Sequence, residues 1–113
     1  MWGIKRVLKR YYFGDYLMLS KNPLDIASGK KLDENGIVQA LRLAIIGELD
    51  AINLYLQLAN AVDDENVKKV LEDIAEEEKV HVGELLELLK KLDVEQAEAL
   101  EKGMREVKEL LTR

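Results

Sequence analysis

The chain has 113 residues, of which 48% are hydrophobic and 35% charged, with a net charge of −5 and no Cys. This length suits one domain, and the apolar share excludes a disordered chain. The lack of Cys excludes disulfides and thiolate metal sites. The acidic balance argues against a nucleic-acid partner, and no apolar run reaches the ~20 residues that a transmembrane helix needs. We therefore expect a soluble, cytoplasmic, mostly helical protein.

The first 17 residues differ in composition from the rest of the chain. They include four basic residues and one acidic residue, Asp15. This segment therefore has a net charge of +3, and the remainder of the chain has a net charge of −8. Every aromatic residue except Tyr55 lies here. We expect residues 1–17 to form a basic aromatic arm. It either covers helices of its own chain or of a neighbour, or binds a partner protein or an anionic membrane surface. Its expected helical face consists of Ile4, Val7, Leu8 and Tyr11.

Turn-forming residues at 20–31 predict that residues 18–32 connect this arm to a helical domain at 33–113. N-cap signals at Asp33, at Asp63 and Asp64, and at Asp93 predict three helices, with Asp93 and Gln96 resembling a capping box. The first two helices are expected to end near residues 60 and 91. The third has a regular apolar stripe, formed by Ala97, Leu100, Met104, Val107 and Leu111. The predicted fold class is all-α, an antiparallel two-helix hairpin followed by a short C-terminal helix, with no β-type alternation.

The first long helix is apolar around almost its whole circumference. One face carries Ile37, Leu41, Ile45, Ile52 and Leu56, and the other sides carry Val38, Leu43, Ile46, Leu49, Leu54 and Leu58. Such a helix is normally buried on several sides. Two further helices of one chain cannot surround it, so we expect an obligate oligomer in which a second copy completes a four-helix bundle.

Two acids and the single His interrupt the apolar faces of the hairpin. Glu48 lies in the first helix at helical spacing from Ile45 and Ile52, while Glu78 and His81 lie on an apolar face of the second. Carboxylates are seldom buried unless they are paired or bind a metal. Residue 63, in the predicted turn, is midway between the two Glu residues, so both lie roughly 22 Å from the turn. We expect them to meet at the same height.

One Glu facing a Glu-x-x-His motif is half of a helical di-iron carboxylate site. With one His in the chain, the other half must come from a second copy, and a two-fold dimer is the commonest arrangement. Carboxylate and imidazole donors suit iron or manganese. Glu48, Glu78 and His81 are therefore the predicted metal ligands and catalytic residues.

Other interpretations of these residues remain open. The run from Glu76 to Lys79 is also typical of a solvated charged face. His81 also fits the pattern of a histidine whose hydrogen bonds are satisfied in an apolar core. A metal-free structural or adaptor module would use Glu48 and His81 as an ion pair that fixes helix register. A third alternative keeps the two metals but uses them to scavenge peroxide.

The stretches LRLAIIGELDAINLYLQLAN (41–60) and VLEDIAEEEKVHVGELLELL (70–89) resemble the encapsulated ferritins, and the likeness extends from about residue 18 to the end. They are also similar to the ferritin-like domain fused to some archaeal encapsulin shell proteins. The resemblance implies a ferroxidase that oxidises Fe(II) to Fe(III) at a di-iron centre shared by two subunits. It also implies a decameric ring and iron storage inside an encapsulin nanocompartment. By the same resemblance Glu48, Glu78 and His81 are iron ligands, and Tyr55 lies beside the centre.

The sequence departs from the family at the site through which iron reaches the centre. Gly47 stands where relatives carry an acid and Leu54 where some carry Trp, which leaves Asp50 as the remaining candidate for metal access. The chain also ends at Arg113 without the linker and apolar tail that usually dock such cargo. We therefore expect either a truncated or shell-fused protein, or docking through the N-terminal arm.

Overall fold

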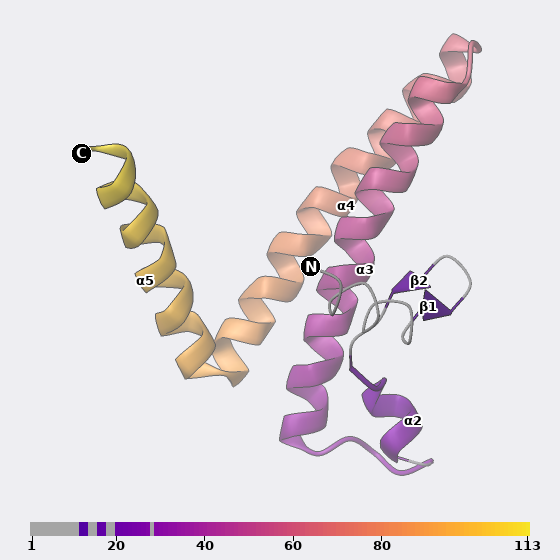
Figure 1. Cartoon of the computed structure of the whole chain (residues 1–113). Helices are drawn as coiled ribbons and strands as arrows, with labels where there is room; N and C mark the ends of the chain where they lie inside the picture. The colour runs from indigo at the N-terminus through magenta and orange to yellow at the C-terminus, as the bar shows by residue number, and fades with distance from the viewer. Residues whose placement is uncertain (1–11, 14–15, 18–19, 28) are drawn as a thin grey trace.

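The computed structural model describes residues 12–13, 16–17, 20–27 and 29–113. Two long antiparallel helices, α3 (Glu34–Ala61) and α4 (Glu65–Leu92), form a hairpin, and α5 (Val94–Leu111) diverges from its open end (Figure 1). This architecture confirms the predicted all-α class. None of the helices described combines the length and apolar character needed to cross a membrane.

Local capping explains where the long helices begin. The Asp33 side chain accepts a hydrogen bond from the Gly36 N–H at 2.8 Å, and Asp64 accepts from the N–H groups of Asn66 and Val67. Each bond satisfies a backbone donor that has no partner within the helix. The predicted helix boundaries are therefore accurate to within one or two residues.

Small side chains hold the two long helices close together. Ala59 on α3 and Ala75 on α4 are fully buried, and Val38 and Leu89 complete the apolar core among the residues described. Because an alanine projects only a methyl group, the helix backbones can approach closely at these positions. This core fixes the register that aligns the middle of α3 with the middle of α4.

The C-terminal helix packs much less than the hairpin does. It starts directly after α4, with Asp93 as the only intervening residue, and none of its residues is buried. Figure 1 shows α4 and α5 diverging from this corner as the two arms of a V. Its predicted apolar stripe is exposed at Leu100, Met104, Val107 and Leu111.

Two short elements before α3 were not predicted. Helix α2 (Pro23–Ala27) lies within the segment expected to be a connector, where no helix was anticipated. The Asn22 side chain accepts from the Leu24 N–H at 3.0 Å, and Pro23 suits the first position of a helix because it needs no N–H partner there.

The other unpredicted element is a minimal hairpin of two-residue strands, β1 (Tyr12–Phe13) and β2 (Tyr16–Leu17). Strands of two residues are too short to show β-type alternation in the sequence. The expected helical face of the arm, from Ile4 to Tyr11, lies outside the described residues.

Candidate metal centre

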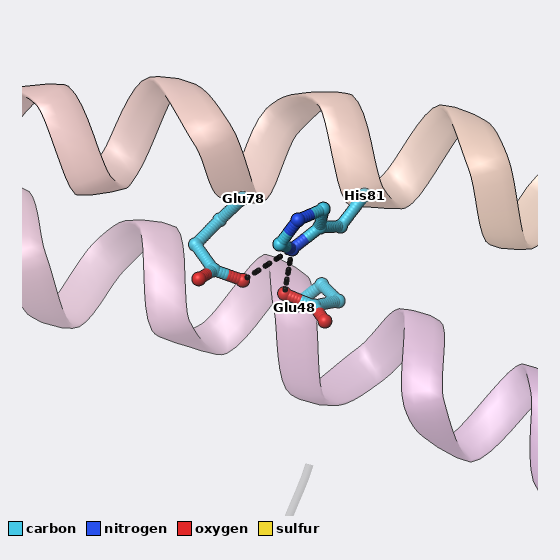
Figure 2. A group of neighbouring side chains, drawn as sticks. All are labelled: Glu48, Glu78 and His81. Carbon is cyan, nitrogen blue, oxygen red and sulfur yellow. Dashed lines mark ion pairs between the residues drawn. The ribbon is translucent and has the colours of Figure 1, made fainter.

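The structure brings Glu48, Glu78 and His81 together at mid-height of the hairpin (Figure 2). Glu48 projects from α3, and Glu78 and His81 project from successive turns of α4. One donor atom from each lies within 4.8 Å of the others, and this group is the one that could hold a metal ion among the described residues. The equal distance of the two acids from the turn is the reason that they meet.

The imidazole lies between the two carboxylates. His81 Nδ1 is 3.4 Å from Glu78 Oε2 and 3.6 Å from Glu48 Oε2. Both separations exceed an ordinary hydrogen bond. They are close to the roughly 3.0–3.4 Å between neighbouring donors around an ion with bonds of about 2.1 Å. The two separations from His81 Nδ1 are therefore compatible with a small divalent cation, and the third donor pair lies within 4.8 Å.

The charges of the group favour the same kind of ligand. Two carboxylates face one imidazole, which is neutral or carries at most one positive charge. The side chains of Glu78 and Glu48 are only 17% and 25% exposed, so water screens their mutual repulsion poorly. A bound cation would offset that repulsion. The chemistry of the donors, one nitrogen and carboxylate oxygens, suits iron, manganese or zinc.

The group is open on one side. The His81 side chain is 47% exposed, while both carboxylates are more covered. Three protein ligands leave further positions of a metal ion free for water, substrate or ligands from another chain. A single copy therefore offers three ligands and leaves room for others.

The structure places the two other predicted residues near this group but not in it. Tyr55 is half-buried on the Glu48 face of α3, and no hydrogen bond links it to the three donors in the described part of the chain. Asp50 is exposed and lies outside the group, as do Gly47 and Leu54. No residue beyond the predicted three joins the donors among those described.

Comparisons with known proteins agree with this architecture. The rubrerythrin family profile matches residues 39–112. The chain is 55% identical over 93 residues to a ferritin-like–encapsulin shell fusion protein of Pyrococcus furiosus, covering 82% of this chain but only 27% of that protein. It is 38% identical over 89 residues to the encapsulin nanocompartment cargo protein EncC of Myxococcus xanthus, covering 75% of this chain and 68% of that one.

A solved structure is also similar. The crystal structure of the encapsulated ferritin domain from Pyrococcus furiosus superposes with a TM-score of 0.73 and 52% identity, covering 85% of this chain and 98% of that chain. The chain spans about a quarter of the full fusion protein, so the likeness concerns its ferritin-like part. The chain therefore belongs to the rubrerythrin family and, with these relatives, to the encapsulated ferritins.

Proposed function

We propose that this protein is a ferroxidase that oxidises Fe(II) to Fe(III) at a two-iron site shared by two copies. The observation that carries the proposal is the convergence of Glu48, Glu78 and His81 on a group that one copy leaves open. Each Fe(II) gives up one electron, so two neighbouring Fe(II) ions together reduce dioxygen to hydrogen peroxide with two protons. Iron is the substrate here, and hydrogen peroxide is an alternative oxidant.

The side chains supply electrostatic stabilisation. The carboxylates of Glu48 and Glu78 offset the charge of the bound cations and favour Fe(III) over Fe(II) because hard anionic oxygen donors prefer the higher charge. The imidazole of His81 supplies a nitrogen donor from the next turn of α4. Once a second copy covers the group, the apolar residues around it would limit access of water.

The surface around the donors supports a second copy as the missing half. Residues at spacings of three and four follow one side of α3 and α4 through the three donors, and we call this the metal-side strip. It comprises Ile37, Leu41, Ala44, Glu48, Ala51, Tyr55 and Leu58 on α3, and Val67, Val70, Ile74, Glu78, His81, Leu85, Leu88 and Leu92 on α4. Its only charged or ionisable members, apart from the Tyr55 phenol, are the three donors, and none of its residues is buried.

This spacing is the one by which helices pack in four-helix bundles. A second hairpin laid on the strip by a two-fold axis would cover the exposed apolar side chains and contribute the same three donors. The completed site would then hold four Glu and two His residues, the set found in helical di-iron proteins. A two-fold pair is therefore the proposed active unit, and a decameric ring of such pairs follows from the resemblance to encapsulated ferritins.

Alanine substitution tests the ligands. Glu48→Ala, Glu78→Ala and His81→Ala should each remove most Fe(II) oxidation above the uncatalysed rate and lower the iron content measured by elemental analysis. Glu76→Ala is the matched control, since Glu76 is an exposed acid of α4 that pairs with Lys79. Wild-type oxidation and metal content in all three variants would refute the proposal and favour a metal-free adaptor.

A pair of valines tests whether the site is shared. Val70, on the metal-side strip, is 59% exposed, and Val80, on another side of α4, is 61% exposed. Val70→Asp would place an unpaired charge in the proposed interface, which is strongly unfavourable. The Val70→Asp variant should be monomeric by light scattering and should lack ferroxidase activity. The Val80→Asp variant should keep the oligomeric state and the activity of the wild type. An active Val70→Asp monomer would show that one copy suffices.

We further propose that the oxidised iron is stored inside an encapsulin compartment, with the shell protein as partner. The basic and aromatic composition of residues 1–17 makes this arm the proposed docking segment. When the chain is co-expressed with an encapsulin shell, it should co-purify with assembled shells. Deletion of residues 1–17 should reduce that loading, and unchanged loading would assign docking to another part of the protein.

A further inference from the structure

The junction between α4 and α5 is formed by a single residue with several contacts. The Asp93 N–H donates to the Leu89 carbonyl at 2.8 Å and closes α4, while Asp93 Oδ1 accepts from the Gln96 N–H at 3.0 Å and caps α5. One carboxylate oxygen therefore belongs to the cap of α5. The other oxygen, Oδ2, is free to accept a bond from elsewhere.

That bond comes from α3. Arg42 Nη2 donates to Asp93 Oδ2 at 2.6 Å, and Arg42 Nε donates to Gln96 Oε1 at 3.3 Å. Among the described residues, these hydrogen bonds link the Arg42 side chain of α3 to the α4–α5 junction and to α5. Because guanidinium N–H groups have fixed relative directions, the two contacts constrain the orientation of their partners as well as their distance.

Packing does little to fix the direction of α5. None of its residues is buried, and its apolar stripe is exposed at Leu100, Met104 and Val107. A one-residue junction limits how sharply α5 can fold back but leaves rotation about the Asp93 backbone. The contact to Asp93 holds the corner itself, and the contact to Gln96, within the first turn of α5, opposes that rotation.

We propose that Arg42 is a positioning residue that sets the direction in which α5 leaves the hairpin. The guanidinium binds one group at the corner and one group inside α5, so that α5 and α3 keep a fixed relative orientation. The role of Arg42 is separate from the metal donors, since it requires none of them. It determines where the exposed apolar stripe of α5 lies relative to the hairpin.

Distance measurements between spin labels test this role. Because the chain contains no Cys, labels can be attached at Gln57→Cys on α3 and Glu101→Cys on α5, both exposed positions. The labelled chain is diluted into excess unlabelled chain, so that distances within one copy dominate in pulsed dipolar spectroscopy. The doubly labelled protein that retains Arg42 should give one narrow distance distribution, and its Arg42→Met variant should give a clearly broader one.

Matched variants distinguish a change in the orientation of α5 from a general effect of removing a positive charge or of losing helical structure. Lys90→Met removes the nearby Lys90–Glu87 ion pair, which lies within α4, and should leave the distribution narrow. Gln96→Leu keeps the Asp93 contact and should broaden it by less than Arg42→Met. Circular dichroism should show equal helix content in all variants. A distribution for Arg42→Met as narrow as that with Arg42 present, or equal broadening by Lys90→Met, would overturn the proposal.

Discussion

The hairpin and α5 are held in place by different kinds of interaction. The hairpin has a buried apolar core, including the fully buried Ala59 and Ala75, whereas α5 has no buried residue and is tied to the rest through Asp93 and Arg42. Apolar burial contributes in proportion to area, while an exposed ion pair contributes on the order of 0–1 kcal/mol. The hairpin can therefore carry a geometrically demanding site, and α5 depends on polar contacts for its direction.

Truncating one leucine in each region should give the largest contrast in stability. Leu89→Ala removes a side chain from the hairpin core and should lower the free energy of unfolding by about 2–5 kcal/mol. Leu100→Ala, on the half-exposed stripe of α5, should cost about 1 kcal/mol or less. Urea unfolding followed by circular dichroism measures both. An equal loss would show that α5 is packed as well as the hairpin in the assembled protein.

Metal binding should stabilise the hairpin without acting on α5. A cation that binds only the folded protein raises its stability by about 2.7 kcal/mol at a free concentration one hundred times its Kd. Mn(II), which avoids oxidation during the experiment, should therefore raise the urea midpoint of the wild type but not that of His81→Ala. Hydrogen exchange should slow in α3 and α4 and stay unchanged in α5. Equal stabilisation of both proteins would place Mn(II) elsewhere.

Helix caps should contribute less than core residues. Asp64→Ala removes the side chain that accepts from the Asn66 and Val67 N–H groups at the start of α4, at an expected cost of about 1 kcal/mol. Asp64→Asn, which retains an acceptor oxygen, should restore most of this stability. If the Ala variant is as stable as the wild type, packing alone determines where α4 begins.

Glycine substitutions should give the smallest effects. Gly83 in α4 and Gly103 in α5 lie inside helices, and a Cβ added at either meets no atom within 4 Å beyond the adjacent backbone of its own helix in the described part of the chain. Gly83→Ala and Gly103→Ala should each stabilise the protein by about 0.4–1 kcal/mol, because Ala restricts the unfolded chain more than Gly does. Thermal unfolding measures the shift. Destabilisation at one position would identify close approach of another copy there.

The fold was predictable to the extent that local chemistry determines it. Side chains of Asp33, Asp64 and Asp93 cap the helices that follow them, and each acts within three residues of its own position. The short helix α2 was missed although Asn22 and Pro23 are a recognisable helix start, because the surrounding Ser, Gly and Lys residues favoured turns. The contact of Arg42 with Asp93 spans 51 positions and has no sequence signal.

The position of the candidate site was predictable because a hairpin gives simple register. Glu48 and Glu78 are equally far from the turn, and helical spacing adds His81, so the meeting of these three side chains required no knowledge of loop geometry. Their role as iron ligands stays a prediction. No comparable rule predicts the direction of α5, because a one-residue junction allows many orientations. The residue proposed to select one of them, Arg42, lies on α3.

Ala75 gives the hairpin a further property. It is completely buried and lies three residues before Glu78, so a small side chain occupies the contact between the helices one turn from the donor atoms. We expect the span between carboxylates on opposite helices to depend on this side chain, although it carries no donor atom. Enlarging that methyl group would tune which ionic radius the pocket tolerates, leaving every ligand chemically intact.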